Sequence, residues 1–131
     1  MIFELHPQLI EETDLLGHFP LCLALLHKDN AAPWMVLVPK RDGLKEFHHL
    51  PSEDLQQFLR EAQAVCNALE HLFVPDKINI GSLGNMVPQV HIHIIARYKG
   101  DIAWPKPMWG NTRGELRTDK EHQGILSLIH I

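Results

Sequence analysis

The sequence has few cysteines and no long apolar run. Only Cys22 and Cys66 occur in 131 residues, without the close spacing that marks zinc or redox motifs. We therefore expect free thiols in a cytoplasmic protein rather than a disulfide or a metal pair. No secretory signal is recognised and no apolar run is long enough to span a membrane, so no membrane partner is expected. Repeats and low-complexity tracts are also absent, which predicts one domain over residues 1–131.

Basic residues are scarce as well. Lysine and arginine total 12 against 16 aspartates and glutamates, a formal net charge of −4. A general nucleic-acid binder usually has a basic surface that neutralises phosphates, so this balance argues against a nucleic-acid partner. A small phosphate ligand needs only a local positive patch. The candidates for that patch are Lys40, Arg41, Arg97 and Lys99.

The most informative stretch is an alternation of polar and apolar residues from Gln89 to Ile94. This period predicts a half-buried strand, on which Gln89, His91 and His93 share one face. A Gly-rich turn at 84–88 leads into it, and its backbone N–H groups could face an anion. A histidine with a free ring nitrogen can act as a nucleophile, and two histidines at i and i+2 can chelate a metal. Both can also be structural, so the residues alone leave three interpretations open.

Other segments predict an antiparallel sheet around this strand. Short apolar runs bounded by turns indicate strands, and the first two are expected to form a hairpin. The strand before the Gly-rich turn is expected to pair with the histidine strand. The chain start is predicted as an arm at 3–10, followed by a helix start or turn at 11–14. The predicted strands are residues 21–26, 34–38, 77–81 and 89–94.

One long helix is predicted from Ser52 to Leu72, because apolar residues recur there at intervals of three and four. Ser52 is the expected N-cap, and the acidic residues after it suit the positive end of the helix dipole. Leu59 belongs to the apolar stripe that should be buried. Glu61 belongs to the face that should be solvated.

The segment Gln89-Val90-His91-Ile92-His93-Ile94-Ile95 resembles the signature of the histidine triad (HIT) family. That signature reads His-φ-His-φ-His-φ-φ after a Gly-rich turn, where φ is apolar, and Gln89 takes the place of the first histidine. The resemblance covers about 21–110 and is similar to a bacterial branch of HIT-domain or diadenosine-tetraphosphate-hydrolase-like proteins. It implies an α+β fold with an antiparallel sheet and one long helix, usually as a homodimer. Residues 111–131 would form a C-terminal extension.

The resemblance also implies an activity. Family members bind a nucleotide and cleave it at the α-phosphate, and neither a cofactor nor an obligatory metal is expected. His91 would be the nucleophile that forms a nucleotidyl-histidine, which water then hydrolyses. His93 and Gln89 would donate hydrogen bonds to phosphate oxygens, where charge develops. The substrate could be an adenosine polyphosphate or a phosphoramidate.

Further positions follow from the same resemblance. Asn79 would support the site and Asn85 would contact a phosphate. The family's ribose-binding position matches His27 by ungapped alignment. Asp29, two residues on, is favoured chemically, because a carboxylate accepts hydrogen bonds from both ribose hydroxyls. An equal alternative is that each of these polar residues caps its own turn.

Trp34 marks a departure from the family pattern, because many members carry an additional histidine at this position. With Gln89, it leaves fewer imidazoles to protonate a leaving group. Trp34 is also a candidate wall for the nucleotide base. These departures motivate a second hypothesis, a nucleotide-binding module with little or no catalysis.

Overall fold

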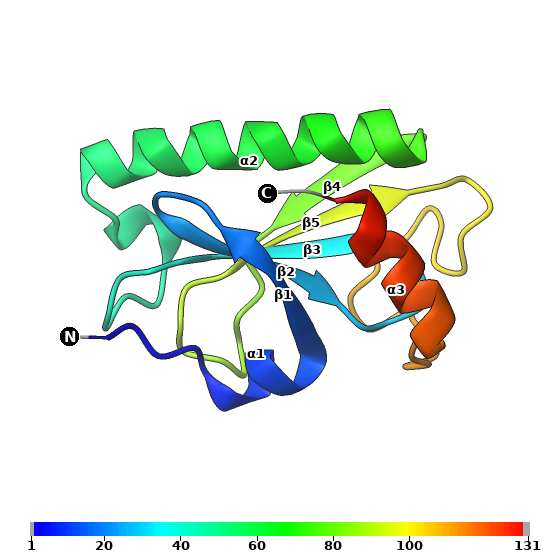
Figure 1. Cartoon of the computed structure of the whole chain (residues 1–131), viewed down its shortest axis with the longest axis horizontal. Coiled ribbons are helices and arrows are strands. Elements are labelled where there is room, and N and C mark those ends of the chain that lie inside the picture. The colour runs from blue at the N-terminus through cyan, green and yellow to red at the C-terminus, as the bar shows by residue number, and fades with distance from the viewer. Residues whose placement is uncertain (1, 130–131) are drawn as a thin grey trace.

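The computed structural model describes residues 2–129 and consists of one antiparallel sheet with helices around it (Figure 1). The five strands lie in the order β1-β2-β3-β5-β4, and all neighbouring pairs are antiparallel. This is the α+β architecture that the sequence predicts. The elements are α1 (Pro7–Glu12), β1 (Thr13–His18), β2 (Cys22–His27), β3 (Trp34–Pro39), a 3-10 turn η1 (Phe47–His49), α2 (Ser52–Phe73), β4 (Lys77–Gly81), β5 (Ile92–Arg97) and α3 (Asp119–Leu128).

The two faces of the sheet have different covers. On one face, α2 packs along the sheet, and Val90, Ile92 and Ile94 belong to the buried cluster beneath it, as their alternation predicts. The opposite face is covered by the N-terminal arm and by a loop that carries Met108. His91 and His93 therefore lie on the side away from α2, because neighbouring residues of an extended chain point to opposite faces.

The histidine strand begins later than predicted. Strand β5 starts at Ile92, so the expected start at Gln89 is wrong by three residues. The reason is a hydrogen bond outside the sheet, in which the Val90 N–H donates to the Leu44 carbonyl at 2.9 Å. His93 lies in the strand beside Val36 of β3. His91 lies just before the strand begins.

The sequence prediction missed the first strand. Residues 11–14 do not start a helix, because α1 already runs from Pro7 and ends at Glu12. Proline at the first position has a φ suited to a helix, and the His6 ring caps it by accepting from the Gln8 N–H at 3.1 Å. The chain then continues as β1, an edge strand with a bulge between Leu15 and Gly17.

The long helix is confirmed, with three corrections. Ser52 is its first helical residue, so Pro51 rather than Ser52 is the N-cap. Leu59 is 64% exposed rather than buried. Glu61 is buried, because its carboxylate accepts from the backbone N–H groups of Leu21 and Cys22 at 2.9 and 2.8 Å. It thereby satisfies donors at the start of β2 that have no strand partner.

Both cysteines are free thiols, as expected. Burial raises the pKa of the Cys22 thiol, and the nearby Glu61 carboxylate raises it further. Burial also raises the pKa of Cys66. No helix within residues 2–129 is both long and apolar enough to cross a membrane.

The loop after β5 is built around a buried ion pair. Arg97 is 2% exposed and donates from Nε to the Asp101 carboxylate at 2.8 Å. It also donates to Asn79 Oδ1 and to the Lys106 carbonyl, both at 2.7 Å. These bonds hold the loop against β4 and β5. Arg97 is therefore a structural residue, and its suggested role as positive charge for a ligand is wrong.

The C-terminal extension docks on the turn between β2 and β3. The Asn30 N–H donates to the Glu115 carbonyl at 2.8 Å, and the Arg117 N–H donates to the Lys28 carbonyl at 3.0 Å. The Arg117 guanidinium also donates to the His27 carbonyl. Helix α3 then begins with a capping box, in which the Thr118 and Glu121 side chains each bond to the other residue's backbone N–H. The sequence left the form of 124–131 open; it is helical up to Leu128, and 130–131 lie outside the described residues.

Candidate active site

A cavity of about 350 Å³ lies at the N-terminal end of β5, on the face away from α2. Its volume is within the range of small-molecule sites. Five of the eight site residues predicted from the sequence line it together: His27, Trp34, Asn85, His91 and His93. The other lining residues come from α1, β3, the Gly-rich turn and the loop after β5, and include Glu12, Gly84, Met86, Met108, Trp109 and Thr112.

His91 presents a bare ring nitrogen to this cavity. Its Nδ1 lies 2.7 Å from the Gln89 carbonyl oxygen, which can only accept a hydrogen bond. Nδ1 must therefore carry the ring proton, so Nε2 of the neutral imidazole keeps its lone pair. The ring is 4% exposed and lies close to Gly84, where a Cβ atom would be only 2.9 Å from His91 Cε1. The absence of a side chain at Gly84 thus makes room for the imidazole.

His93 has the opposite tautomer. The Trp34 indole N–H donates to His93 Nδ1 at 2.9 Å, and an indole nitrogen can only donate. The proton of His93 therefore sits on Nε2, which makes this nitrogen a donor. Burial, together with the neighbouring His91 and His27 rings, lowers the pKa of His93 to about 3. His93 is consequently a neutral donor beside His91, with 5.1 Å between their ring centroids.

His27 forms another part of the wall. Its ring stacks on Trp34 with 4.2 Å between centroids and 15° between planes. His27 Nδ1 accepts from the Asp29 N–H at 3.1 Å, so its proton is on Nε2, 3.9 Å from a Glu12 carboxylate oxygen. Burial lowers the pKa of His27, although Glu12 and Asp29 oppose this. A neutral imidazole and an indole thus form one continuous aromatic surface.

Asp29 does not line the cavity. It is buried, and its Oδ1 accepts from the Ala31 N–H at 2.8 Å while Oδ2 accepts from the Thr112 hydroxyl at 2.8 Å. These contacts fit the alternative in which Asp29 caps its own turn. His27, at the position matched by ungapped alignment, is the residue that faces the cavity.

Gln89 and Asn79 also lie outside the cavity wall. The Gln89 amide binds the N-terminal arm, accepting from the His6 N–H and donating to the Glu4 carbonyl, both at 2.9 Å. Asn79 accepts from Arg97 and so supports the loop after β5. Both side chains therefore hold segments that border the site.

No lysine or arginine is among the described residues that line the cavity. Arg41 pairs instead with Asp54 at 2.8 Å on the surface. Nor do residues 2–129 contain any group of three or more histidine, cysteine or acidic side chains placed to hold a metal ion. An anionic ligand would meet neutral donors here.

Sequence reasoning missed Trp109 as a site residue. Its Nε1 is buried without a hydrogen-bond partner, although its indole lies edge-on to His93 with 5.5 Å between ring centroids. The ring packs so closely on Gly81 that a Cβ atom there would be 2.7 Å from Trp109 Cη2. The available signal was a tryptophan in the proline-rich stretch 98–110, for which the sequence favours a rigid apolar flap and the family resemblance offers a segment that helps to form the ligand site.

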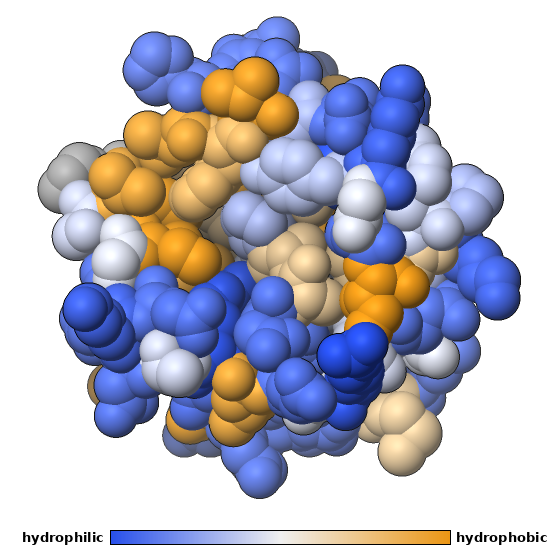
Figure 2. All heavy atoms as spheres, turned by 90° about the vertical axis from the view of Figure 1, so that its right-hand side faces the viewer, coloured by the Kyte–Doolittle hydropathy of each residue, from blue (hydrophilic) through white to orange (hydrophobic). Residues whose placement is uncertain are grey.

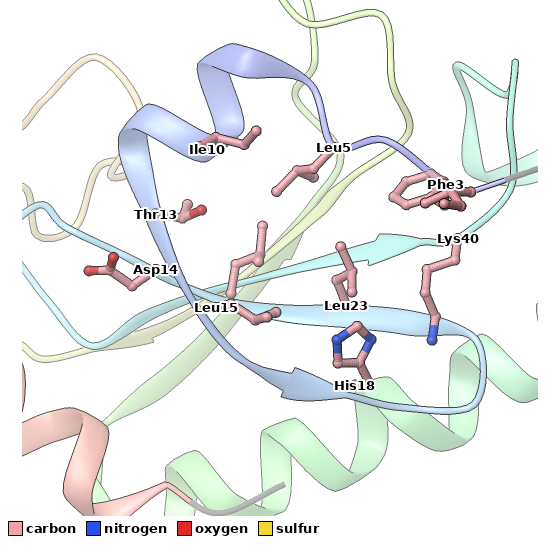
Figure 3. Close-up of a pocket in the computed structure, with 11 residues that line it drawn as sticks. Phe3, Leu5, Ile10, Thr13, Asp14, Leu15, His18, Leu23 and Lys40 are labelled. Carbon is pink, nitrogen blue, oxygen red and sulfur yellow. The ribbon is translucent and has the colours of Figure 1, made fainter.

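Two other hollows lack the paired histidines. The larger, about 560 Å³, is bounded mainly by apolar side chains of the N-terminal arm, β1 and β2, including Leu5, Leu15 and Leu23 (Figure 3). A third hollow of about 300 Å³ lies between α2 and α3. On the side of the molecule that carries α3, Figure 2 shows an apolar surface bordered by hydrophilic side chains. The histidine cavity is smaller than the first of these, but it alone among the three contains the two imidazoles of His91 and His93, which are in edge contact.

The fold and the site define a class of small α+β domains with paired histidines at the start of an antiparallel strand. A profile of the HIT domain matches residues 9–100, and the chain belongs to this family. A histidine triad protein from Bradyrhizobium japonicum is 40% identical with a TM-score of 0.94, covering 98% of this chain and 96% of that one. One from Marinobacter aquaeolei is 41% identical with a TM-score of 0.93, covering 98% and 93%.

A more distant structure shares the fold alone. It is a diadenosine triphosphate hydrolase from Plasmodium falciparum, 18% identical with a TM-score of 0.65, covering 97% of this chain and 77% of that one. Among curated proteins, none matches this chain.

Proposed function

We propose that this protein cleaves a nucleotide at its α-phosphate through a covalent nucleotidyl-histidine on His91. The observation that carries the proposal is the 2.7 Å contact between His91 Nδ1 and the Gln89 carbonyl, which leaves Nε2 bare within the cavity. A ring nitrogen with a lone pair can attack phosphorus, and the covalent route divides one difficult displacement into two easier ones. The distant structure with the same fold is a diadenosine triphosphate hydrolase, and its name is compatible with a nucleotide substrate here.

The neutral donors around His91 suit the charge that develops on phosphorus. His93 Nε2–H is one candidate, and Asn85 on the Gly-rich turn also lines the cavity. Donors fixed before the reaction contribute most where water is excluded. The aromatic surface of His27 and Trp34 would receive the base or the leaving group.

The test is AMP release from diadenosine tetraphosphate and from an adenosine phosphoramidate, followed by chromatography. Release from either compound should be lost in His91→Ala, while nucleotide binding and the fold are retained. His49→Ala is the matched control, because His49 is exposed and outside the cavity. Alkaline denaturation during turnover should trap the nucleotidyl adduct on wild-type protein for mass spectrometry. Full activity of His91→Ala would refute the proposal.

A nucleotide-binding module with little catalysis is the second candidate. It is favoured by the Gln89 amide, which binds the N-terminal arm and lies outside the cavity wall. This candidate predicts micromolar binding of adenosine nucleotides without product or adduct. Calorimetry combined with the trapping experiment separates it from the hydrolase.

The homodimer and the cytoplasmic location remain predictions. The family resemblance supports the dimer, and the free thiols support a reducing compartment. Sedimentation equilibrium of the purified chain would test the dimer directly.

A further inference from the structure

We propose that this cavity selects nucleotides whose leaving group departs as a stable anion, and that it discriminates against phosphoramidates. The substrate class is then the mixed anhydride of a nucleoside monophosphate with a second acid, such as a phosphate or carboxylate. The inference rests on the proposed function, because it concerns the leaving group of that same reaction. It is carried by the hydrogen bonds that fix the protons of the cavity.

The two substrate classes differ in the proton they need. His91 Nε2 forms a bond to phosphorus while the bond to the leaving group breaks, and the electron pair goes with the leaving group. An acid's oxygen departs as an anion and needs no proton. A phosphoramidate nitrogen must collect a proton as it leaves, because an amide anion is far too basic. Water then attacks phosphorus, the bond to Nε2 breaks, and the proton lost by water passes to solvent.

The three imidazoles of the cavity have no proton suited to that task. His91 keeps its proton on Nδ1, bound to the Gln89 carbonyl. His93 and His27 each accept a hydrogen bond at Nδ1, from Trp34 Nε1 and the Asp29 N–H respectively. Protonating either Nδ1 would bring two N–H groups face to face and abolish the bond. Both rings therefore stay neutral, and a neutral imidazole N–H donates a hydrogen bond without releasing its proton.

The remaining polar groups of the wall do not replace a general acid. Asn85, Thr112 and Trp109 supply amide, hydroxyl and indole donors, which are all very weak acids. Glu12 approaches the cavity as a carboxylate that faces His27 Nε2. The described lining contains no lysine. The site can thus stabilise charge on the phosphate but has no ready proton for a departing amine.

Trp34 is the positioning residue behind this selectivity. It is 5% exposed and stacked on His27, so its indole N–H is held toward His93. Trp34→Phe keeps the aromatic ring but removes the N–H. Nδ1 of His93 then loses the donor that occupies it, but burial still keeps the pKa of the ring low, so the ring can act as an acid only in acidic solution.

The experiment compares kcat/KM for two AMP derivatives, one joined to acetate through an acyl-phosphate anhydride and one joined to an alkylamine through a P–N bond. Each compound is also measured as a competitive inhibitor of the other, which separates binding from chemistry. We expect the anhydride to be cleaved and the phosphoramidate to be slower on the order of 10²- to 10⁴-fold, the range that general acid catalysis supplies. His49→Ala should keep this ratio.

The outcomes are distinct. Comparable cleavage of both compounds, or faster cleavage of the phosphoramidate, would overturn the inference and leave the proposed function standing. Cleavage of neither, without an adduct, would overturn both. Trp34→Phe should raise the phosphoramidate rate relative to the anhydride rate as the pH falls toward the lowered pKa of His93, whereas a purely structural role would slow both equally. An unchanged ratio in the folded variant would overturn the role of Trp34.

Discussion

A methyl group at Gly84 should disable His91 without unfolding the protein. Gly84 does not have a positive φ, so alanine fits its backbone. The new Cβ would lie 2.9 Å from His91 Cε1 and 3.0 Å from the Val87 carbonyl oxygen. Carbon atoms in good contact are about 3.5–4.0 Å apart, so the imidazole has to retreat by roughly 0.6 Å or more. Its bond to the Gln89 carbonyl opposes that movement.

The expected result of Gly84→Ala is a fall in kcat of about 10²-fold, because a nucleophile misplaced by about 1 Å loses that much. KM should change little, since the donors around the phosphate remain. Strain of this kind costs about 1–3 kcal/mol of stability, which a urea titration would show. AMP release in the steady state is the assay for the rate.

Gly100→Ala is the matched control, because its Cβ would meet nothing within 4 Å and its φ is also not positive. This variant should retain wild-type rates. If Gly84→Ala had the same kcat as Gly100→Ala, the close contact between Gly84 and the His91 ring would not affect the reaction. That result would contradict the assignment of His91 as the nucleophile.

Trp109→Phe should leave the unliganded protein as stable or about 1 kcal/mol more stable, because it removes a buried donor without a partner. If the indole N–H serves the ligand, nucleotide affinity should fall about fivefold by calorimetry, and equal affinity would exclude that role. Burial opposes ionisation of Asp101, but hydrogen bonds from Arg97 and from backbone N–H groups outweigh it and lower the pKa to about 2. This lies below the unfolded value of about 3.9. Its stabilisation is therefore complete above pH ~4 and is lost as pH falls toward 2. Asp101→Asn should cost about 3 kcal/mol at pH 7 and flatten that acid limb in urea titrations, and an unchanged limb would contradict the reasoning. Gly124→Ala within α3 meets nothing within 4 Å, so urea unfolding should show a gain of about 1 kcal/mol, whereas a loss would mean that the helix needs glycine there.

Periodicity predicted the elements that bury a complete face. The β2–β3 hairpin, α2, β4 and the first half of β5 follow from patterns of apolar residues, and their pairing is as expected. Strand β1 was missed because its buried and exposed side chains do not alternate regularly. It is stabilised by pairing with β2, with a bulge between Leu15 and Gly17. Its strand character depends on a neighbour that the local sequence does not contain.

The candidate site was only partly predictable for a related reason. The signature identified His91 and His93, but their tautomers depend on contacts with Gln89 and Trp34. Trp34 lies 59 residues from His93 in the chain, and β3 had to pair with β5 to bring them together. Glu61 was mispredicted for the same reason. A charged residue on a helix is expected to be exposed, and only the tertiary structure shows that its carboxylate accepts from the backbone at the start of β2.

The cavity is bordered by contacts between distant parts of the chain, and this has a consequence for synthesis on the ribosome. Gln89 binds the backbone of His6 across 83 positions, while Arg117 binds that of His27 across 90. Chains emerge from the N-terminus at about 5–20 residues per second. All five strands are therefore available before Arg117 can reach His27 at the end of β2. We expect a chain stalled before Arg117 to display a formed sheet with an incomplete pocket, so that ligand binding reports that synthesis has passed this residue.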